Sequence, residues 1–190
     1  MFSVADLVVA PDAVPFNLEL AAGVVQVIEN AHPDLGRGLV LLRRPRSGRI
    51  VFAGQDLTRL NDGAMRKLRR RLQYVGGDPR LALLPHQTVS RALDEPARIH
   101  KLAGTANRDR AASLTASLGI SSALHSRPIE TLSTVMRWRV LVARALILEP
   151  DVLIVDAPSA YSAPTLLSDL LADLTAARGT AAVVWLGPTG

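Results

Sequence analysis

Cysteine is absent from the 190-residue sequence, so disulfide bonds and thiolate metal sites are excluded. This absence agrees with a reducing compartment. Long hydrophobic runs are absent too: no apolar stretch approaches the length of a bilayer span, and the first residues lack the basic region and apolar stretch of a signal peptide. We therefore expect a cytoplasmic protein.

Lysine and aromatic residues are scarce. Only Lys67 and Lys101 among the 22 basic residues are lysines, and aromatic residues make up 4% of the chain. The net charge of +5 raises the question of an anionic partner such as RNA or a lipid surface. The densest basic run, Lys67–Arg71, contains no aromatic residue on which a base could stack. A solvated helix face is therefore favoured over a nucleic-acid site.

Apolar patterning and turn residues predict strands that alternate with helices. Strands are expected at Val4–Ala10, Phe16–Leu20, Val24–Ile28, Arg49–Ala53, Leu72–Val75, Val152–Val155 and Ala181–Leu186. Helices are expected at Leu35–Leu42, Asp62–Arg71, Ala92–Leu102, Asn107–Leu118, from Thr131 or Ser133 to about Leu148, and at Pro164–Ala177. Because proline is tolerated only near a helix start, Pro96 predicts that its helix begins later than Ala92. The alternation indicates an α/β domain with a mostly parallel sheet.

Two places in this pattern are typical of nucleotide chemistry. The strand at Val24–Ile28 is followed by a loop, Glu29–Asp34, and then by a helix, which is the order of elements that cradles phosphates. Asp156 follows a buried strand, where a carboxylate can hold a metal ion. Asp156 also fits a simpler role, in which its side chain caps the turn after the strand. The simpler role is favoured.

Short motifs in a fixed order carry a resemblance to a known family. They are Ser47–Ile50, Gly54–Leu57, Asp78-Pro79, Leu132-Ser133, Ala143–Leu146, Glu149-Pro150, and Asp156 with Pro158. With them the chain resembles the ATP-binding subunits of ABC transporters, most closely the oligopeptide, dipeptide and nickel importer type. The resemblance implies a P-loop NTPase-like fold in one domain, residues 1–190. Its core would be 1–88 and 149–190, and an inserted helical subdomain would span about 89–148, without the family's C-terminal segment.

The phosphate loop departs from the family pattern. That pattern, G-x-x-x-x-G-K-[ST], supplies backbone donors, a lysine and a magnesium-binding hydroxyl. Here the loop Glu29–Asp34 has no glycine, and Leu35 and Gly36 stand at the lysine and hydroxyl positions. Pro33 removes one backbone donor, and Asp34 is better interpreted as the N-cap of the helix. His32 offers a weak substitute charge, although an ordinary loop histidine is the favoured interpretation.

Other family positions depart in the same direction. Gly77 replaces the glutamine before the permease-facing segment, and Ala157 replaces the catalytic glutamate, so no catalytic residue is predicted. The signature L-S-G-G-Q reads Leu132-Ser133-Thr134-Val135-Met136. The resemblance implies that Ser133 would contact a partner subunit's nucleotide and that Asp156 would hold a metal ion. The histidine after the last strand is missing, since Leu186 is followed by Gly187-Pro188.

These departures predict a degenerate subunit that is unable to hydrolyse ATP. It would have no cofactor and would act as a structural or regulatory partner of an active ABC ATPase subunit and a membrane permease, in the cytoplasm or peripherally at the inner face of the cell membrane. Two alternatives stay open. One is a functional subunit that binds ATP and Mg²⁺ through an atypical loop and energises peptide or nickel import, as a heterodimer or a homodimer. The other is an arginine-rich module for RNA or lipid.

Overall fold

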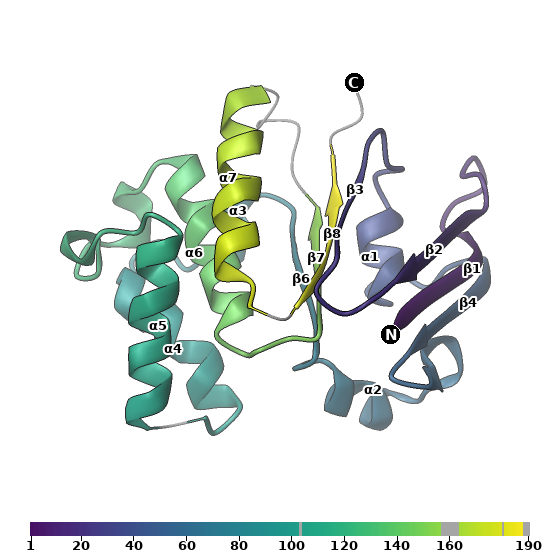
Figure 1. Ribbon diagram of the computed structural model, residues 1–190, viewed down its shortest axis with the longest axis horizontal. Helices are drawn as coiled ribbons and strands as arrows, with labels where there is room; N and C mark the ends of the chain where they lie inside the picture. Colours follow the sequence, from purple (N-terminus) through teal and green to yellow (C-terminus); the bar gives the residue numbers. More distant parts are fainter. Residues whose placement is uncertain (103, 157–163, 180, 188–190) are drawn as a thin grey trace. The chain divides into compact units, whose positions relative to one another are not determined.

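The computed structural model describes residues 1–102, 104–156, 164–179 and 181–187. The chain divides into two compact units (Figure 1). The first unit holds residues 1–74 together with strands β7 (Val152–Asp156) and β8 (Ala182–Leu186). The second unit holds residues 75–149 together with helix α7 (Pro164–Ala177). Among the described residues, every helix is too short or too polar to cross a bilayer.

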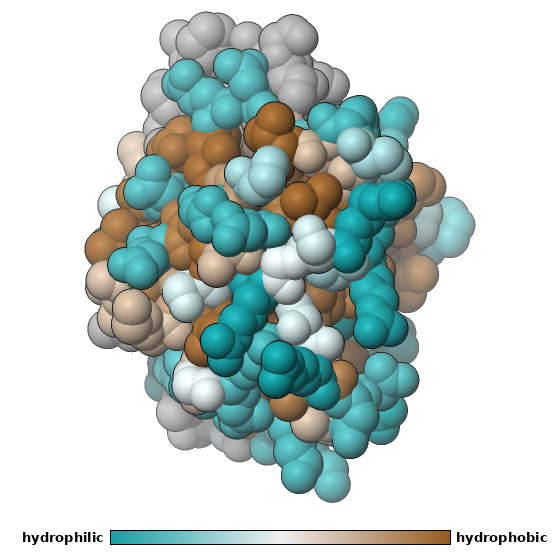
Figure 2. Space-filling model, turned by 90° about the vertical axis from the view of Figure 1, so that its right-hand side faces the viewer, coloured by the Kyte–Doolittle hydropathy of each residue, from teal (hydrophilic) through white to brown (hydrophobic). Residues whose placement is uncertain are grey.

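An antiparallel sheet is the first layer of unit one. Its strands are β1 (Phe2–Val8), β2 (Phe16–Leu20), β4 (Ser47–Phe52) and β5 (Gln55–Asp56), in the order β2-β1-β4-β5. Alternate side chains of β1 and β4 are buried, as expected for a sheet with one face on a core and one in water. The other face of this sheet is mixed in polarity: Figure 2, viewed from the side of β1 and β4, shows hydrophilic residues interrupted by hydrophobic ones.

The parallel sheet has the order β3-β8-β7-β6, with β3 at Val25–Ile28 and β6 at Leu72–Gly76. β8 pairs in parallel with both β3 and β7, and Asp156 lies opposite Leu186 in the register. Strands β7 and β8 are buried almost throughout, because parallel strands are covered on both faces. The prediction of an α/β fold with a parallel sheet is confirmed, and the antiparallel sheet is an addition to it.

The core of unit one lies between the two sheets, where helix α1 (Leu35–Leu39) is placed (Figure 1). This core joins apolar side chains of both sheets, including Phe2, Ile50, Phe52, Ile154 and Val184. A short 3₁₀ turn, η1 (Leu57–Arg59), and helix α2 (Asp62–Leu68) follow β5. Leu57, Met65 and Leu68 extend the same core, which also includes Ala31 and Leu35 from the segment that carries the phosphate-loop positions.

Unit two is helical. Its helices are α3 (Pro79–Ala82), α4 (Val89–Ile99), α5 (Thr105–Ser117), α6 (Thr134–Leu146) and α7, with short 3₁₀ turns at Ser122–Leu124 and Ile129–Thr131. Helix α6 is central to the packing and contacts α3, α4, α5 and α7. The indole of Trp138, on α6, is fully buried. Gly119 has a φ of 63° directly after Leu118, the C-cap of α5, a left-handed conformation that suits glycine at a helix end.

Helix α4 corrects one sequence prediction. It begins at Val89, three residues before Ala92, and its N-cap is Thr88, whose hydroxyl accepts a hydrogen bond from the backbone N–H of Arg91. Pro96 lies inside the helix, although proline costs a backbone hydrogen bond there. Pro96 is buried on the same face as Val89 and Leu93, so apolar packing at helical spacing offsets the lost bond.

Candidate functional site

The loop between β3 and α1 is the segment that would cradle phosphates in a P-loop fold. A phosphate loop works through backbone N–H groups that point free of the protein. Here the N–H of Asp34 donates to His32 Nδ1 at 3.1 Å, and the N–H of Leu35 donates to the carbonyl of His32 at 2.8 Å. Pro33 has no N–H at all. Three consecutive positions therefore offer no free donor to an anion.

His32 organises this loop from within. Its Nδ1 accepts the Asp34 hydrogen bond, and its Nε2 lies 3.5 Å from a carboxylate oxygen of Asp12. An imidazole nitrogen that accepts a hydrogen bond carries no proton, so this arrangement places the ring proton on Nε2, facing Asp12. Both ring nitrogens thus have partners inside the protein. The role of His32 toward a cofactor stays a prediction.

Asp34 occupies the predicted N-cap position of α1, but its side chain does not cap the helix. Asp34 stands directly before α1, but its backbone has φ −91° and ψ −4°, and its side chain caps no N–H. An N-cap carboxylate needs an extended backbone to reach the first free N–H groups of the helix. The Asp34 carboxylate instead forms an ion pair with Arg43, with Oδ2 2.5 Å from Nη1. Helix α1 is correspondingly short and ends at Leu39, three residues before the predicted end at Leu42.

The positions of the family's lysine and hydroxyl are both buried. Leu35 is 4% exposed and belongs to the core of unit one. Gly36 lies against β7: a Cβ placed on it would come within 2.7 Å of Asp156 Oδ2 and 3.0 Å of Tyr74 Cε2. No side chain longer than hydrogen fits there without displacing one of these groups. The position that would carry a magnesium-binding hydroxyl is therefore closed by its neighbours.

Tyr74 is the site residue that sequence reasoning missed. Its hydroxyl donates a hydrogen bond of 2.9 Å to Asp156 Oδ2, joining β6 to the end of β7. The sequence offered one signal for Tyr74: it stands near the end of the strand that precedes Gly77. Since parallel strands end at one edge of a sheet, a polar group on β6 was a candidate neighbour for Asp156.

The environment of this pair favours its uncharged forms. Burial raises the pKa of Asp156, and the Tyr74 hydrogen bond and the nearby Arg37 guanidinium lower it in part. Burial and the Asp156 charge raise the pKa of the Tyr74 hydroxyl, so Tyr74 remains a hydrogen-bond donor across the range in which proteins are studied. Asp156 is thus held against one internal donor in a poorly solvated place.

We expect Asp156→Asn to raise the thermal midpoint at pH 7 by a few degrees, because it removes a buried charge and keeps an oxygen to accept from Tyr74. The folded pKa of Asp156 lies above its ordinary value of 3.8, so its carboxylate costs stability above that folded pKa and costs nothing below the ordinary value. The gain from asparagine should therefore shrink as the pH falls toward 4. Thermal melts of both proteins from pH 4 to pH 8 measure it.

The exposed Asp94, on α4, provides the matched control: Asp94→Asn should shift the midpoint little and without this pH trend. A lower midpoint for Asp156→Asn at pH 7 would contradict the prediction. It would mean that attraction between the carboxylate and Arg37 outweighs the cost of burial.

The remaining predicted site residues lie elsewhere. Ser133, in unit two, is the N-cap of α6, and its hydroxyl accepts from the N–H of Met136 at 3.2 Å. This confirms one of the two predicted caps, while a contact of Ser133 with a partner's nucleotide stays a prediction. Gly77 has a φ of 82°, a conformation that glutamine would adopt only with strain. Ala157, at the glutamate position, lies outside the described residues.

The residues of this site do not fit a magnesium nucleotide. The lysine position is apolar and buried, the hydroxyl position is a closed glycine, and the single carboxylate is engaged by Tyr74. No group of three or more His, Cys, Asp or Glu side chains that could hold a metal ion occurs within the described ranges. The role of Asp156 as a metal ligand therefore stays a prediction, and no second ligand is described beside it.

Comparison with known proteins gives the chain a family context. A model described as ABC transporter matches residues 35–160. The dipeptide transport ATP-binding protein DppF of Escherichia coli is 34% identical over 161 residues, which cover 83% of this chain and 48% of DppF. The oligopeptide transport ATP-binding protein AppF of Bacillus subtilis is 32% identical over 153 residues, 78% of this chain and 46% of AppF. The chain spans about half the length of these relatives.

Solved structures show the same fold at lower identity. The structure of cbiO1 from Clostridium perfringens, described as part of the ABC transporter complex cbiONQ, superposes with a TM-score of 0.77 at 23% identity. The superposition covers 98% of this chain and 78% of cbiO1. The predicted P-loop NTPase-like fold is confirmed by this likeness.

Proposed function

Because the chain belongs to the ABC transporter family of ATP-binding subunits, we propose that it is a degenerate subunit that neither binds nor hydrolyses ATP productively. It serves as a structural or regulatory partner of an active ATPase subunit in a complex with a membrane permease. Relatives named for dipeptide and oligopeptide transport support a peptide as the transported substrate. The proposed subunit thus occupies the family's place in a transporter but lacks its ATPase chemistry.

One observation carries the proposal: the Tyr74 hydroxyl and Gly36 close the place where a magnesium site would form. Magnesium requires several oxygen ligands in an octahedral arrangement around an accessible carboxylate. Asp156 has its Oδ2 in a hydrogen bond with Tyr74, and a Cβ on Gly36 would come within 2.7 Å of the same oxygen. An ion bound at Oδ2 would have to displace the Tyr74 hydroxyl. This supports loss of the metal-dependent step rather than a variant of it.

The loop supports the proposal from a second direction. Phosphoryl transfer depends on positioning and on neutralising phosphate charge, because little covalent chemistry is left to the protein. With Leu35 buried and the N–H groups of Asp34 and Leu35 engaged by His32, the loop offers no cation at the lysine position and no free donor at residues 33–35. The nearby Asp34 carboxylate is held by Arg43, which uses a cation that could otherwise face a phosphate.

Isothermal titration with ATP and MgCl₂ tests the proposal. We expect no magnesium-dependent heat up to millimolar ATP, because a buried leucine stands at the lysine position and a closed glycine at the hydroxyl position. The same titration is made with Asp156→Asn, and with Asp94→Asn as the control for a change in net charge. Micromolar, magnesium-dependent binding that only Asp156→Asn weakens would overturn the proposal and identify the chain as a working ATP-binding subunit.

A further inference from the structure

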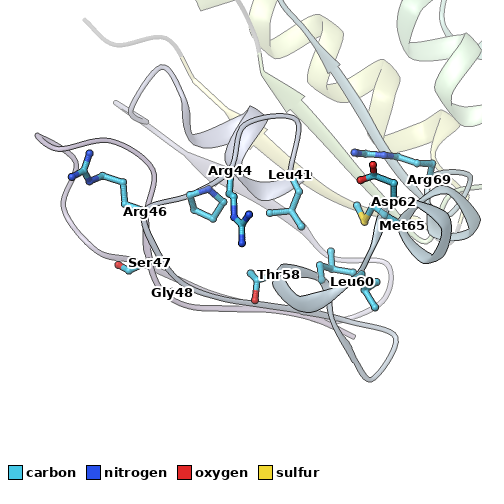
Figure 3. A pocket seen from close by; sticks show the side chains of 12 residues that line it. Leu41, Arg44, Arg46, Ser47, Gly48, Thr58, Leu60, Asp62, Met65 and Arg69 are labelled. Carbon is cyan, nitrogen blue, oxygen red and sulfur yellow. The ribbon is translucent and has the colours of Figure 1, made fainter.

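A polar cavity lies in unit one, away from the phosphate loop. Its volume is about 430 Å³, within the usual range of small-molecule pockets. The segment after α1, from Leu41 to Gly48, forms one wall, and η1 with α2 forms the other (Figure 3). All lining residues belong to unit one, so the cavity is complete within it.

Positive charge dominates this part of the chain. Residues 41–71 contain ten basic side chains and two acidic ones, Asp56 and Asp62. Asp56 is already engaged, since its Oδ2 lies 3.0 Å from Arg49 Nε and 3.4 Å from Arg59 Nε. Asp62 is therefore the one carboxylate left to balance the arginines that line the cavity. The cavity keeps an excess of positive charge.

Arg69 brings a partly desolvated cation to one end of the cavity. Its Nη1 donates to the carbonyl oxygen of Val40 at 2.6 Å, which fixes the guanidinium. Burial lowers the pKa of Arg69, which shows that the charge has lost part of its hydration. A carbonyl oxygen satisfies one N–H but does not neutralise the charge. An anion that enters the cavity would meet a guanidinium that is already held in place.

Arg44 supplies the second cation. Its side chain points into the space between Leu41 and Thr58, whereas Arg46 points away from it (Figure 3). Arg44 has no carboxylate within ion-pair distance in the part of the chain that the structure describes. Arginine binds phosphate through parallel N–H donors, so an unpaired arginine that faces a cavity is suited to this group.

Part of the lining is apolar. Leu41, Pro45, Leu57, Leu60 and Met65 line the same cavity as the arginines. A small inorganic anion would leave this apolar surface uncovered, whereas a larger ligand would bury it and gain from the hydrophobic effect. The two chemistries together describe a ligand with an anionic end and an apolar body.

We propose that the cavity between residues 41–48 and the η1–α2 segment binds a phosphate monoester carried on an apolar body, with Arg44 holding the phosphate and Arg69 adding positive charge at one end of the cavity. A phosphate monoester carries nearly two negative charges at neutral pH, so the excess of positive charge in the cavity favours it over a carboxylate, which carries one. The ligand is either a soluble phosphate ester or the headgroup of a lipid. The site is independent of the proposed loss of ATPase chemistry, because it shares no residue with Gly36, Tyr74 or Asp156.

Titration with 1-naphthyl phosphate, with 1-naphthol as the uncharged control, tests the proposal on the whole chain. We expect saturable binding of the phosphate and weaker binding of naphthol. Arg44→Gln should weaken phosphate binding about tenfold, the usual effect of losing one charge-assisted contact. Arg66→Gln is the matched control: it removes the same charge from an exposed position on α2 outside the cavity.

Sedimentation with phosphatidylcholine vesicles, with and without phosphatidic acid, separates the two sources of the ligand. Arg44-dependent binding to the phosphatidic acid vesicles identifies a lipid headgroup, and Arg44-dependent binding of naphthyl phosphate alone identifies a soluble ester. No binding of either probe would overturn the proposal, as would equal weakening by Arg44→Gln and Arg66→Gln. If ATP gives heat that Arg44→Gln abolishes and Asp156→Asn leaves unchanged, ATP binds in this cavity. The two proposals can therefore fail separately.

Discussion

Restoring the family's lysine, by Leu35→Lys, is expected to destabilise the protein by roughly 3–5 kcal/mol rather than create a phosphate site. Leu35 is 4% exposed in the core between the two sheets, so the substitution removes apolar packing and places an ammonium group among residues such as Leu39 and Ile154. Urea unfolding, followed by circular dichroism, measures the loss.

Two controls separate burial from other effects of this change. Leu35→Met keeps the volume and the apolar character, and it should cost less than about 1.5 kcal/mol. Leu42→Lys makes the same exchange at a position that is 59% exposed, and it should change stability by no more than about 0.5 kcal/mol. If Leu35→Lys were as stable as the parent and bound ATP, α1 would be able to turn this position outward, contrary to the structure.

Restoring the hydroxyl, by Gly36→Ser, should cost about 1–3 kcal/mol, the usual effect of overpacking a closed site. The new Cβ would stand 2.7 Å from Asp156 Oδ2 and 3.1 Å from Asp156 Cβ, so the carboxylate would have to move and would strain its bond with Tyr74. Serine has a better helix propensity than glycine, which offsets only a few tenths of this cost. The same urea unfolding measures it.

Gly63 offers a matched control, because it is a helical glycine on α2 whose added Cβ would meet only Asn61 Oδ1, at 3.4 Å. Gly63→Ser should be neutral or slightly stabilising. Gly36→Ser should cost less in a Tyr74→Ala background than in the parent, since the phenol ring forms one side of the closed site. A Gly36→Ser protein as stable as the Gly63→Ser protein would mean that Asp156 yields without cost.

Much of the fold could be predicted from the sequence because its strands and helices have strong local signals. The run Val152–Val155 is apolar throughout and is found as β7, and α7 begins and ends at the predicted residues. Predictions failed where tertiary contacts overrule local preference. Pro96 lies inside α4 because its face is buried, and α1 ends early at Leu39. Periodicity alone carries no information on either.

The departures of the site from the family pattern could be identified from the sequence, but the contacts of its residues could not. The lost lysine and hydroxyl could be identified from Leu35 and Gly36, because their positions are fixed by spacing from the loop. The partner of Asp156 could not, because Tyr74 is 82 residues away in the chain and its hydroxyl meets Asp156 only after the parallel strands align. Asp34 stands at the predicted N-cap position, but the sequence could not show that its backbone conformation keeps the side chain from capping the helix.

The closed contact among Gly36, Tyr74 and Asp156 also bears on how this chain can change over generations. If the proposed loss of ATPase chemistry is correct, each single substitution toward the family pattern at Leu35 or Gly36 is expected to lower stability before it gives any binding. Sequences that regain the pattern would then need several substitutions together, because each one alone disturbs this contact or the neighbouring core.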